Sequence, residues 1–425
     1  MQRSLIVEKT PFYYGWVILG AGTLGIIMTS PGQTYAVSVF IEYFIRDLAL
    51  SRSLVSTLYA LGTLTGSLAL FKVGREIDRR GSRFMVVAIA GAFGLACIYM
   101  GAVRGPLTLA LGFVAIRMLG QGSLGLVSQN VINQWWVGRR GTMMGISGLF
   151  SALLGLGGFP SLINWMIPQF GWRTAYVILG FMLLLVMVPV GYLFFRERPE
   201  QFGLLPDGEQ EGASGSQAEE ERLARRATEV ALTRGAALRT VTFWIVAAGT
   251  TSVGMLSTAL FFHMVSIFAD NNLPASVAAS VYVPIAATTA LVTVTSGALL
   301  DRISLRYALA ASLFLLALSM GLVQFLSSVP LAFVYGVLLG ATMGLYRIVA
   351  TVAWAHYFGR RHLGAIAGAA STIMIIGAAV GPIPLGVARD LLGSYNLALT
   401  LLALIPLALS VASLLVLKRP VARGE

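Results

Sequence analysis

One arginine, Arg347, lies in the apolar stretch 331–354, LAFVYGVLLGATMGLYRIVATVAW, which holds no other charged residue. A helix of this length would measure about 36 Å, enough to cross a hydrocarbon core of about 30 Å. A guanidinium inside such a helix costs about 2.5–3.5 kcal/mol unless it faces water or a partner. Guanidinium and carboxylate groups pair through two parallel hydrogen bonds, so the chemistry that this residue indicates is the binding of an anion.

Arg117 and His263 are two further ionisable residues in apolar surroundings. Arg117 shares a helical face with Gln121 and Ser128, and it could hold a substrate or bond to neighbouring backbone carbonyls. His263 has an unperturbed pKa of about 6.5, so it could be a proton-sensitive gate. It could equally be satisfied by a hydrogen bond and nothing more. The sequence leaves both alternatives open for each of these two residues.

Other polar and aromatic side chains complete a candidate binding site. Pro31 and Gly32 in TSPGQTY predict a break in the first apolar segment, which would free backbone polar groups beside the next residues. Broken helices of this kind often line transport sites. The predicted substrate-binding set is Arg347, Arg117, Gln121, Gln33, Tyr35, Tyr59, Tyr282, Tyr346, Thr351 and Trp354.

The elements that must position these residues are membrane-spanning helices. The chain is 57% hydrophobic and only 11% charged, with a mean hydropathy of +0.80, whereas a soluble domain carries about 25% charged residues. We predict an all-α membrane protein. The single cysteine, Cys97, excludes a disulfide within the chain and suggests no metal site. The predicted spans are 15–41, 53–73, 84–103, 107–134, 141–167, 174–195, 241–268, 276–300, 307–327, 331–354, 363–385 and 396–417.

The distribution of charge predicts the orientation of these spans. A net charge of +12 would otherwise raise the possibility of nucleic-acid binding, which we do not expect here. Most of the 30 Lys and Arg residues fall in the tails and in alternate loops. By the positive-inside rule these loops are cytoplasmic, so both termini should be cytoplasmic. We expect a multi-pass protein of the bacterial inner membrane.

The two halves of the chain repeat each other. The only long polar segment, 196–240, separates a predicted bundle of six helices at 1–195 from a second one at 241–425. GREIDRRGSR begins at residue 74 and GALLDRISLR at residue 297, and a second pair of GRR motifs has nearly the same offset. By this offset the counterpart of Arg347 is Leu126, so the arginine breaks the repeat. We interpret the paired motifs as evidence of two parallel six-helix repeats around a central axis.

Arg347 also lacks an evident acidic partner in the sequence. Glu42, Asp47, Asp270 and Asp390 all lie near the ends of predicted spans, and none lies in a span interior. A salt bridge inside the bundle and an arginine solvated by a cavity are the structural alternatives. An anion brought in by the substrate is the simplest neutraliser.

Several motifs resemble those of the major facilitator superfamily. Its loop signature, Gly-x-x-x-Asp-Arg/Lys-x-Gly-x-Arg, is matched by Gly74, Asp78, Arg79, Gly81 and Arg83, and Arg117 with Gly120 and Gly122 resembles its fourth-helix motif. The resemblance implies twelve helices, alternating access and a structural role for Arg117. It also implies a cytoplasmic gate formed by Gly74, Asp78, Arg79, Arg83, Asp301 and Arg302, although these loops could serve only as topology signals.

A finer resemblance is to the monocarboxylate porter and oxalate/formate antiporter branch of that superfamily. It is carried by SVFIEYFIRDLALSRSLVS after the first span, WVGRRGTMMGISG at the fifth and HYFGRRHLGAIAG at the eleventh. That branch places a basic residue in the eighth or eleventh span, and here both interiors are uncharged.

These observations predict a secondary active transporter, not an enzyme. No nucleotide-binding motif of the Gly-x-x-x-x-Gly-Lys-Ser/Thr kind is present, so we expect a gradient to supply the energy and no cofactor. The predicted cargo is a small organic anion such as a monocarboxylate, moved by proton symport or anion exchange. Efflux of drug-like or amphiphilic compounds is the alternative, and a non-transporting transceptor is a third. The expected partners are the substrate and the lipid bilayer, and we expect a monomer.

Overall fold

The computed structural model describes residues 7, 9–136, 139–208, 232–299, 304–358 and 363–417, and within these ranges every regular element is a helix. The first half contains α2 (Gly15–Ile27), α3 (Thr34–Val37), α4 (Ile41–Leu48), α5 (Arg52–Arg80), α6 (Ser82–Gly101), α7 (Pro106–Ile116), α8 (Gly125–Trp135), α9 (Arg140–Phe150), α10 (Phe159–Met182) and α11 (Val188–Phe194). Short 3-10 segments lie at η1 (Ser30–Gly32) and η2 (Ser38–Phe40). π-helical turns continue these helices at η3 (Arg117–Leu124), η4 (Ser151–Gly158) and η5 (Leu183–Met187).

The second half is built in the same way. After η6 (Pro199–Phe202), η7 (Pro206–Gly208) and α13 (Arg234–Leu238) come α14 (Val241–Asp270), α15 (Ala275–Ser280), α16 (Tyr282–Leu299), α17 (Leu305–Leu322), η8 (Val323–Phe325), α18 (Val329–Phe358), α19 (Leu363–Val380), α20 (Pro382–Leu392) and α21 (Asn396–Val416). The all-α prediction is confirmed, because apolar segments in lipid must satisfy their backbone groups internally.

Eleven stretches of the described residues are long and apolar enough to cross a membrane. One of them, Thr142–Phe194, has 53 residues and would measure about 80 Å as a straight helix, too long for a single crossing. It is interrupted at Gly171, whose φ of 78° is non-helical and suits glycine, so the chain turns back inside α10. The described helices therefore make twelve passes, the number that the sequence predicts.

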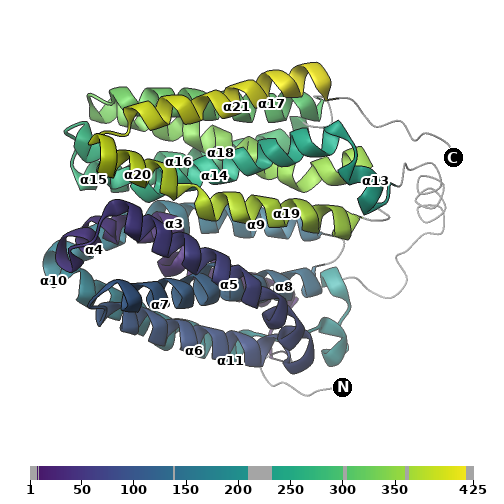
Figure 1. Ribbon diagram of the computed structural model, residues 1–425. Coiled ribbons are helices and arrows are strands. Elements are labelled where there is room, and N and C mark those ends of the chain that lie inside the picture. The colour runs from purple at the N-terminus through teal and green to yellow at the C-terminus, as the bar shows by residue number, and fades with distance from the viewer. Residues whose placement is uncertain are drawn as a thin grey trace.

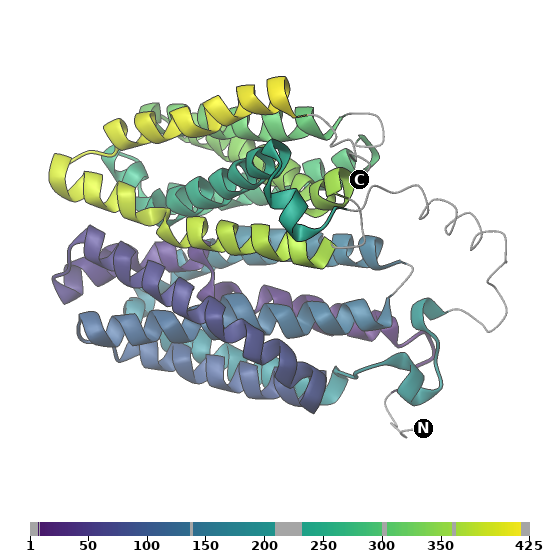
Figure 2. The same cartoon turned by 45° about the vertical axis from the view of Figure 1, so that its right-hand side comes forward.

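The helices form two bundles that lie side by side (Figures 1 and 2). The N-terminal bundle comprises α2 to α11 and the C-terminal bundle α14 to α21, and each has its own buried apolar core. Both chain ends are marked on the same side of the molecule in Figure 1, which we call the termini side. The other side is called the far side.

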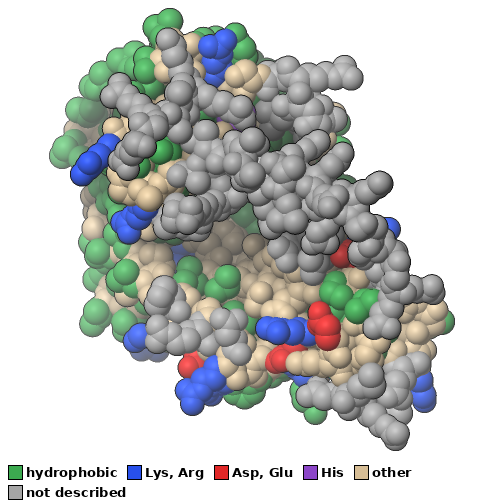
Figure 3. All heavy atoms as spheres, turned by 90° about the vertical axis from the view of Figure 1, so that its right-hand side faces the viewer, with side chains coloured by type: hydrophobic (Ala, Val, Ile, Leu, Met, Phe, Trp, Pro, Cys, Tyr) green, Lys and Arg blue, Asp and Glu red, His purple; other side chains and the backbone are tan. Residues whose placement is uncertain are grey.

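The contacts between the bundles differ between these two sides. On the far side, α20 packs along α5, α15 packs against α10, and α14 packs against η2. Phe262 of α14 belongs to the core of the N-terminal bundle, so apolar packing is continuous across the boundary there. On the termini side, Figure 3 shows a hollow near the middle of the surface. The protein is therefore closed on the far side and hollowed from the termini side.

The predicted break in the first span is confirmed. The helix α2 ends at Ile27, Ser30–Gly32 forms a 3-10 turn, and Gln33 is extended with φ −84° and ψ 152°. At this break the chain packs directly against η3, because a Cβ on Gly32 would collide with the carbonyl oxygen of Ile116 and lie 3.1 Å from the Cα of Gly120.

We expect Gly32→Ala to lower the free energy of unfolding by about 1–3 kcal/mol, because two backbones would have to move apart. Gly20→Ala is the matched control, since a Cβ there meets nothing within 4 Å. Thermal unfolding of both purified variants in the same detergent measures the difference. Equal stability of the two variants would contradict close packing at the break.

Candidate functional site

Arg117 forms a hydrogen bond to the backbone at the break in the first span. Its Nη1 donates a hydrogen bond of 2.8 Å to the carbonyl oxygen of Gly32, and its Nε donates one of 2.9 Å to Thr63 Oγ1. The guanidinium lies over the ring of Tyr59, 4.6 Å from its centroid, and the residue is only 4% exposed. The carbonyl that the broken helix leaves without an intrahelical partner is thus satisfied by a buried cation of the same bundle.

An aromatic layer lies between the two bundles. We define it as Tyr35 and Tyr59 of the N-terminal bundle together with Phe262 and Tyr282 of the C-terminal bundle. The rings of Tyr59 and Phe262 have centroids 4.8 Å apart, and those of Tyr35 and Tyr282 6.3 Å apart.

Hydrogen bonds hold the hydroxyls of this layer. The Tyr59 hydroxyl lies 2.6 Å from Thr34 Oγ1, and the Tyr35 hydroxyl lies 2.9 Å from Ser30 Oγ. The Tyr282 hydroxyl crosses the boundary and lies 3.1 Å from Ser38 Oγ. Tyr59 and Tyr282 are fully buried, so the aromatic layer seals the bundles against each other.

Arg347 is exposed, in contrast to Arg117. Its position in α18 is 18 residues after the start of the helix, about 27 Å along the axis from the far side, whereas Tyr59 is about 10 Å from the far-side start of α5. A Cβ on Gly148 of α9 would lie 3.0 Å from the Arg347 Nη1. The guanidinium therefore reaches the opposite bundle, on the termini side of the aromatic layer.

The other predicted binding residues differ in their exposure and in their contacts. Tyr346 and Gln33 are half-buried, Gln121 is exposed, and Gln33 Nε2 donates a hydrogen bond of 3.1 Å to Thr29 Oγ1. The structure does not bring Trp354 to the boundary, since its ring packs inside the C-terminal bundle. The side chain of Thr351 lies outside the described part of the structure.

His263 is buried in the C-terminal bundle near the far side. Its Nε2 donates a hydrogen bond of 2.8 Å to the carbonyl oxygen of Pro382. Its Nδ1 lies 3.3 Å from the hydroxyl oxygen of Tyr395, and the single proton of that hydroxyl is donated to Ser266 Oγ. Both ring nitrogens thus lie close to polar groups of the same bundle, and the residue is 1% exposed.

The predicted gate on the termini side is only partly described. Arg79 lies 4.0 Å from Glu76, and Arg83 donates a hydrogen bond of 2.7 Å to the carbonyl oxygen of Tyr192. Gly74 lies within α5. The side chain of Asp78 and the whole of Asp301 and Arg302 lie outside the described part of the structure.

Sequence reasoning missed two residues next to these sites. Gly148 carries no chemistry of its own, and only the neighbouring bundle shows that it faces a guanidinium. Glu197 occupies the space beside Gly81, where φ is 85° and a Cβ would collide with the carboxylate. The Gly in the loop signature could have suggested a positive φ, but nothing in the sequence indicated Glu197.

Two six-helix bundles with a charged residue at their boundary define a multi-pass membrane carrier. The family model of the Major Facilitator Superfamily matches residues 22–294, and the chain belongs to this family. Members of this family are transporters and not enzymes. The protein is therefore an integral membrane protein and a secondary transporter, which acts on a small molecule within a lipid bilayer.

Two solved structures support this fold. They are those of a bacterial homolog to the human lysosomal transporter Spinster, in inward-facing unoccupied and occupied conformations. The first has 17% sequence identity over 95% of both chains with a TM-score of 0.62. The second has 17% identity over 95% of this chain and 93% of that chain with a TM-score of 0.61. Such low identity shows the fold alone. A search of curated proteins found no match.

We expect Arg117→Lys to lower the free energy of unfolding by about 1.5–3 kcal/mol, because an ammonium cannot keep both hydrogen bonds and the stacking on Tyr59. Thermal unfolding measures this loss, with Arg104→Lys in an exposed loop as the control. If the two lysine variants unfold at the same temperature, Arg117 does not brace the broken span.

Proposed function

We propose that this transporter carries a small organic anion, such as a monocarboxylate, which pairs with Arg347 between the two bundles. The observation that supports the proposal is the exposure of a guanidinium far inside a membrane-spanning helix, pointing at the opposite bundle. A cation in this position attracts an anion strongly, since a site with low-dielectric walls concentrates its field. The monocarboxylate porter and oxalate/formate antiporter branch remains the relevant comparison for the cargo.

The two interior arginines have different roles in this proposal. Arg117 is a structural residue, because its guanidinium is buried and bonded to Gly32 and Thr63. Arg347 is the substrate-binding residue, because solvent reaches it. Tyr346, Gln121 and Gln33 are the proposed hydrogen-bonding residues of the same site. The packing of Trp354 against Phe243 favours a structural role for the Trp354 ring.

In alternating access, a site that contacts both bundles can couple substrate binding to their relative movement. A carboxylate on Arg347 of the C-terminal bundle lies next to Gly148 of the N-terminal bundle, so both bundles can sense its presence. The aromatic layer separates the site from the far side, and the hollow opens toward the termini side (Figure 3). Parting of the aromatic layer and closure of the gate around Asp78 and Asp301 would then release the anion on the far side.

We propose that the coupling proton travels with the acid or that transport is an exchange of anions. His263 is the proton-coupling candidate of the sequence, and its burial inside one bundle with Nε2 bonded to the carbonyl oxygen of Pro382 favours a structural role instead. From the positive-inside rule we propose that the termini side faces the cytoplasm of a bacterial cell. The division at 1–195, 196–240 and 241–425 agrees with the two separate cores and is part of the proposal.

We expect Arg347→Gln to reduce uptake of a labelled monocarboxylate into proteoliposomes by about 10- to 100-fold, since charge-assisted hydrogen bonds are worth about 1.5–3 kcal/mol. Arg104→Gln, at an exposed loop, is the control and should transport normally. Thermal-shift measurements against carboxylates, sugars, amines and amphiphilic drugs identify the ligand class, since a bound ligand raises apparent stability. Normal carboxylate uptake by Arg347→Gln would refute the proposal. Stabilisation by amphiphilic drugs alone would favour efflux.

Gly148→Ala tests the geometry of the same site. The added methyl group would lie 3.0 Å from the Arg347 Nη1 and should push the guanidinium away from α9. We expect the KM for the anion to rise by about 3- to 10-fold, because misplaced hydrogen bonds lose about 1 kcal/mol. Gly145→Ala, one turn earlier, meets nothing within 4 Å and is the matched control. Identical KM values for both alanine variants would contradict contact between the site and α9.

A further inference from the structure

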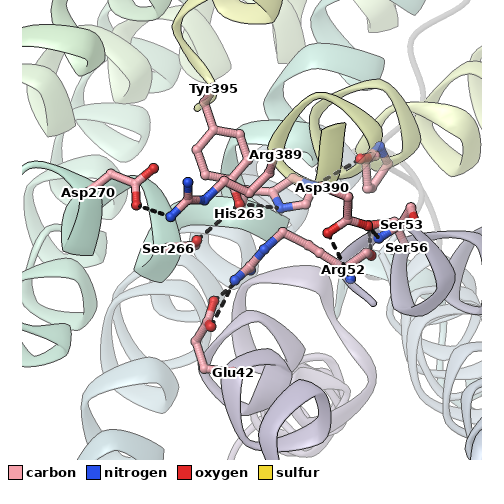
Figure 4. A network of polar contacts seen from close by, with 11 residues as sticks. Glu42, Arg52, Ser53, Ser56, His263, Ser266, Asp270, Arg389, Asp390 and Tyr395 are labelled. Carbon is pink, nitrogen blue, oxygen red and sulfur yellow. Dashed lines mark hydrogen bonds and ion pairs between the residues drawn. The ribbon is translucent and has the colours of Figure 1, made fainter. Parts of the chain in front are cut away.

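On the far side, a carboxylate of one bundle binds the helix terminus of the other. The side chain of Asp390 in α20 accepts hydrogen bonds from the backbone amides of Arg52, at 3.3 Å, and Ser53, at 2.7 Å (Figure 4). These amides are the first two of α5, a helix of 29 residues. The first amides of a helix lack intrahelical acceptors and carry the positive end of its dipole, so a carboxylate stabilises them.

The ion pairs around this contact stay within single bundles. The guanidinium of Arg52 binds Glu42 of α4 through two hydrogen bonds of 2.6 and 2.9 Å. On the other side, Arg389 binds Asp270 of α14 at 2.8 Å. Neither side-chain pair links the two bundles, so the bundles can part without breaking an Arg–carboxylate pair of this network. Within this network, the polar contact that joins the two bundles is the one between Asp390 and the amides of α5.

The helix that carries Asp390 is held to its own bundle at both ends. At its start, the carbonyl oxygen of Pro382 accepts the hydrogen bond from His263 of α14. Near its end, Arg389 is paired with Asp270 of the same helix α14. Asp390 therefore moves with the C-terminal bundle and not with α5.

The two helices also approach each other closely one turn before Asp390. A Cβ on Gly386 would lie 2.7 Å from Ser56 Oγ and 3.3 Å from the Cα of Ser53. Ser56 is fully buried in this closed arrangement. Solvent can reach it from the far side only when α20 leaves α5.

We propose that Asp390 is the latch of the far side. Its carboxylate holds the N-terminus of α5 while the carrier is hollowed from the termini side, and the contact breaks when the carrier opens to the far side. The proposal rests on alternating access and not on the identity of the cargo. Asp390 is thus a positioning residue, which acts on the site by setting the balance between two states.

The test measures the accessibility of Ser56 in proteoliposomes without substrate. Cys97→Ala removes the native thiol, and Ser56→Cys then reports opening through its rate of reaction with a membrane-impermeant maleimide. We expect Asp390→Asn to raise this rate by about 3- to 10-fold, because the isosteric amide has no charge to offer the helix terminus. Asp47→Asn is the matched control, since Asp47 accepts hydrogen bonds from Arg46 and Trp172 within the N-terminal bundle only.

An unchanged labelling rate in Asp390→Asn would overturn the latch, whatever the transport assay shows. If Asp390→Asn does not fold, Asp390→Glu provides the second variant: its longer side chain displaces the carboxylate and should also raise the labelling rate. An equal rate in that variant would likewise count against the proposal. A raised rate together with normal behaviour of Arg347→Gln would support the latch and refute only the anion site.

A double cysteine variant, Ser56→Cys with Gly386→Cys, provides an independent measurement. The close approach at these positions should allow a disulfide to form on oxidation. We expect the cross-link to abolish transport and a reductant to restore it. Transport that continues at the parental rate in the cross-linked carrier would contradict parting of α20 from α5.

Discussion

A guanidinium inside a membrane must be paired, hydrogen-bonded or hydrated, and this constraint organises the protein. Arg117 meets it with the carbonyl oxygen of Gly32, a group that exists as an acceptor only because the first span is broken there. The guanidinium thus gains an acceptor, and the free carbonyl oxygen of the broken helix gains a donor. Arg347 is exposed at the boundary of the bundles, with its Nη1 close to Gly148 of the opposite bundle. The same side-chain chemistry thus serves as a brace in one bundle and as a candidate binding group in the other.

The boundary between the bundles is built from contacts that can be remade. The aromatic layer joins Tyr59 to Phe262 and Tyr35 to Tyr282 through ring packing. Hydroxyl contacts cross the boundary from Tyr282 to Ser38 and from Ser161 to the carbonyl oxygen of Ala279. Strong Arg–carboxylate pairs on the far side remain inside their own bundles (Figure 4). This arrangement suits a carrier that alternates between two states. Strong contacts within each bundle keep it rigid, and weaker contacts between the bundles allow them to move apart.

Much of the architecture could be predicted from the sequence, since each span must be a continuous apolar helix. The twelve passes, the break at Pro31–Gly32 and the two-bundle arrangement follow from hydropathy, backbone chemistry and the internal repeat. Trp354 shows the limit of this reasoning. It shares a helical face with Arg347 by periodicity, yet its ring packs against Phe243 and Phe358. The same face of a long helix meets different neighbours along its length, and α14 covers it at Trp354.

The sequence by itself determined that the protein is a helical membrane transporter and that two arginines, but no acidic residues, lie inside its predicted spans, because composition, periodicity and motif spacing are local properties of the chain. Only the tertiary structure decided which arginine is buried, that Gly148 faces Arg347, and that Asp390 binds the start of α5. These outcomes depend on contacts between segments far apart in sequence. The sequence shows that a residue is an arginine, but only the packing of distant segments decides whether its guanidinium is buried against a carbonyl oxygen or exposed at the boundary of two bundles.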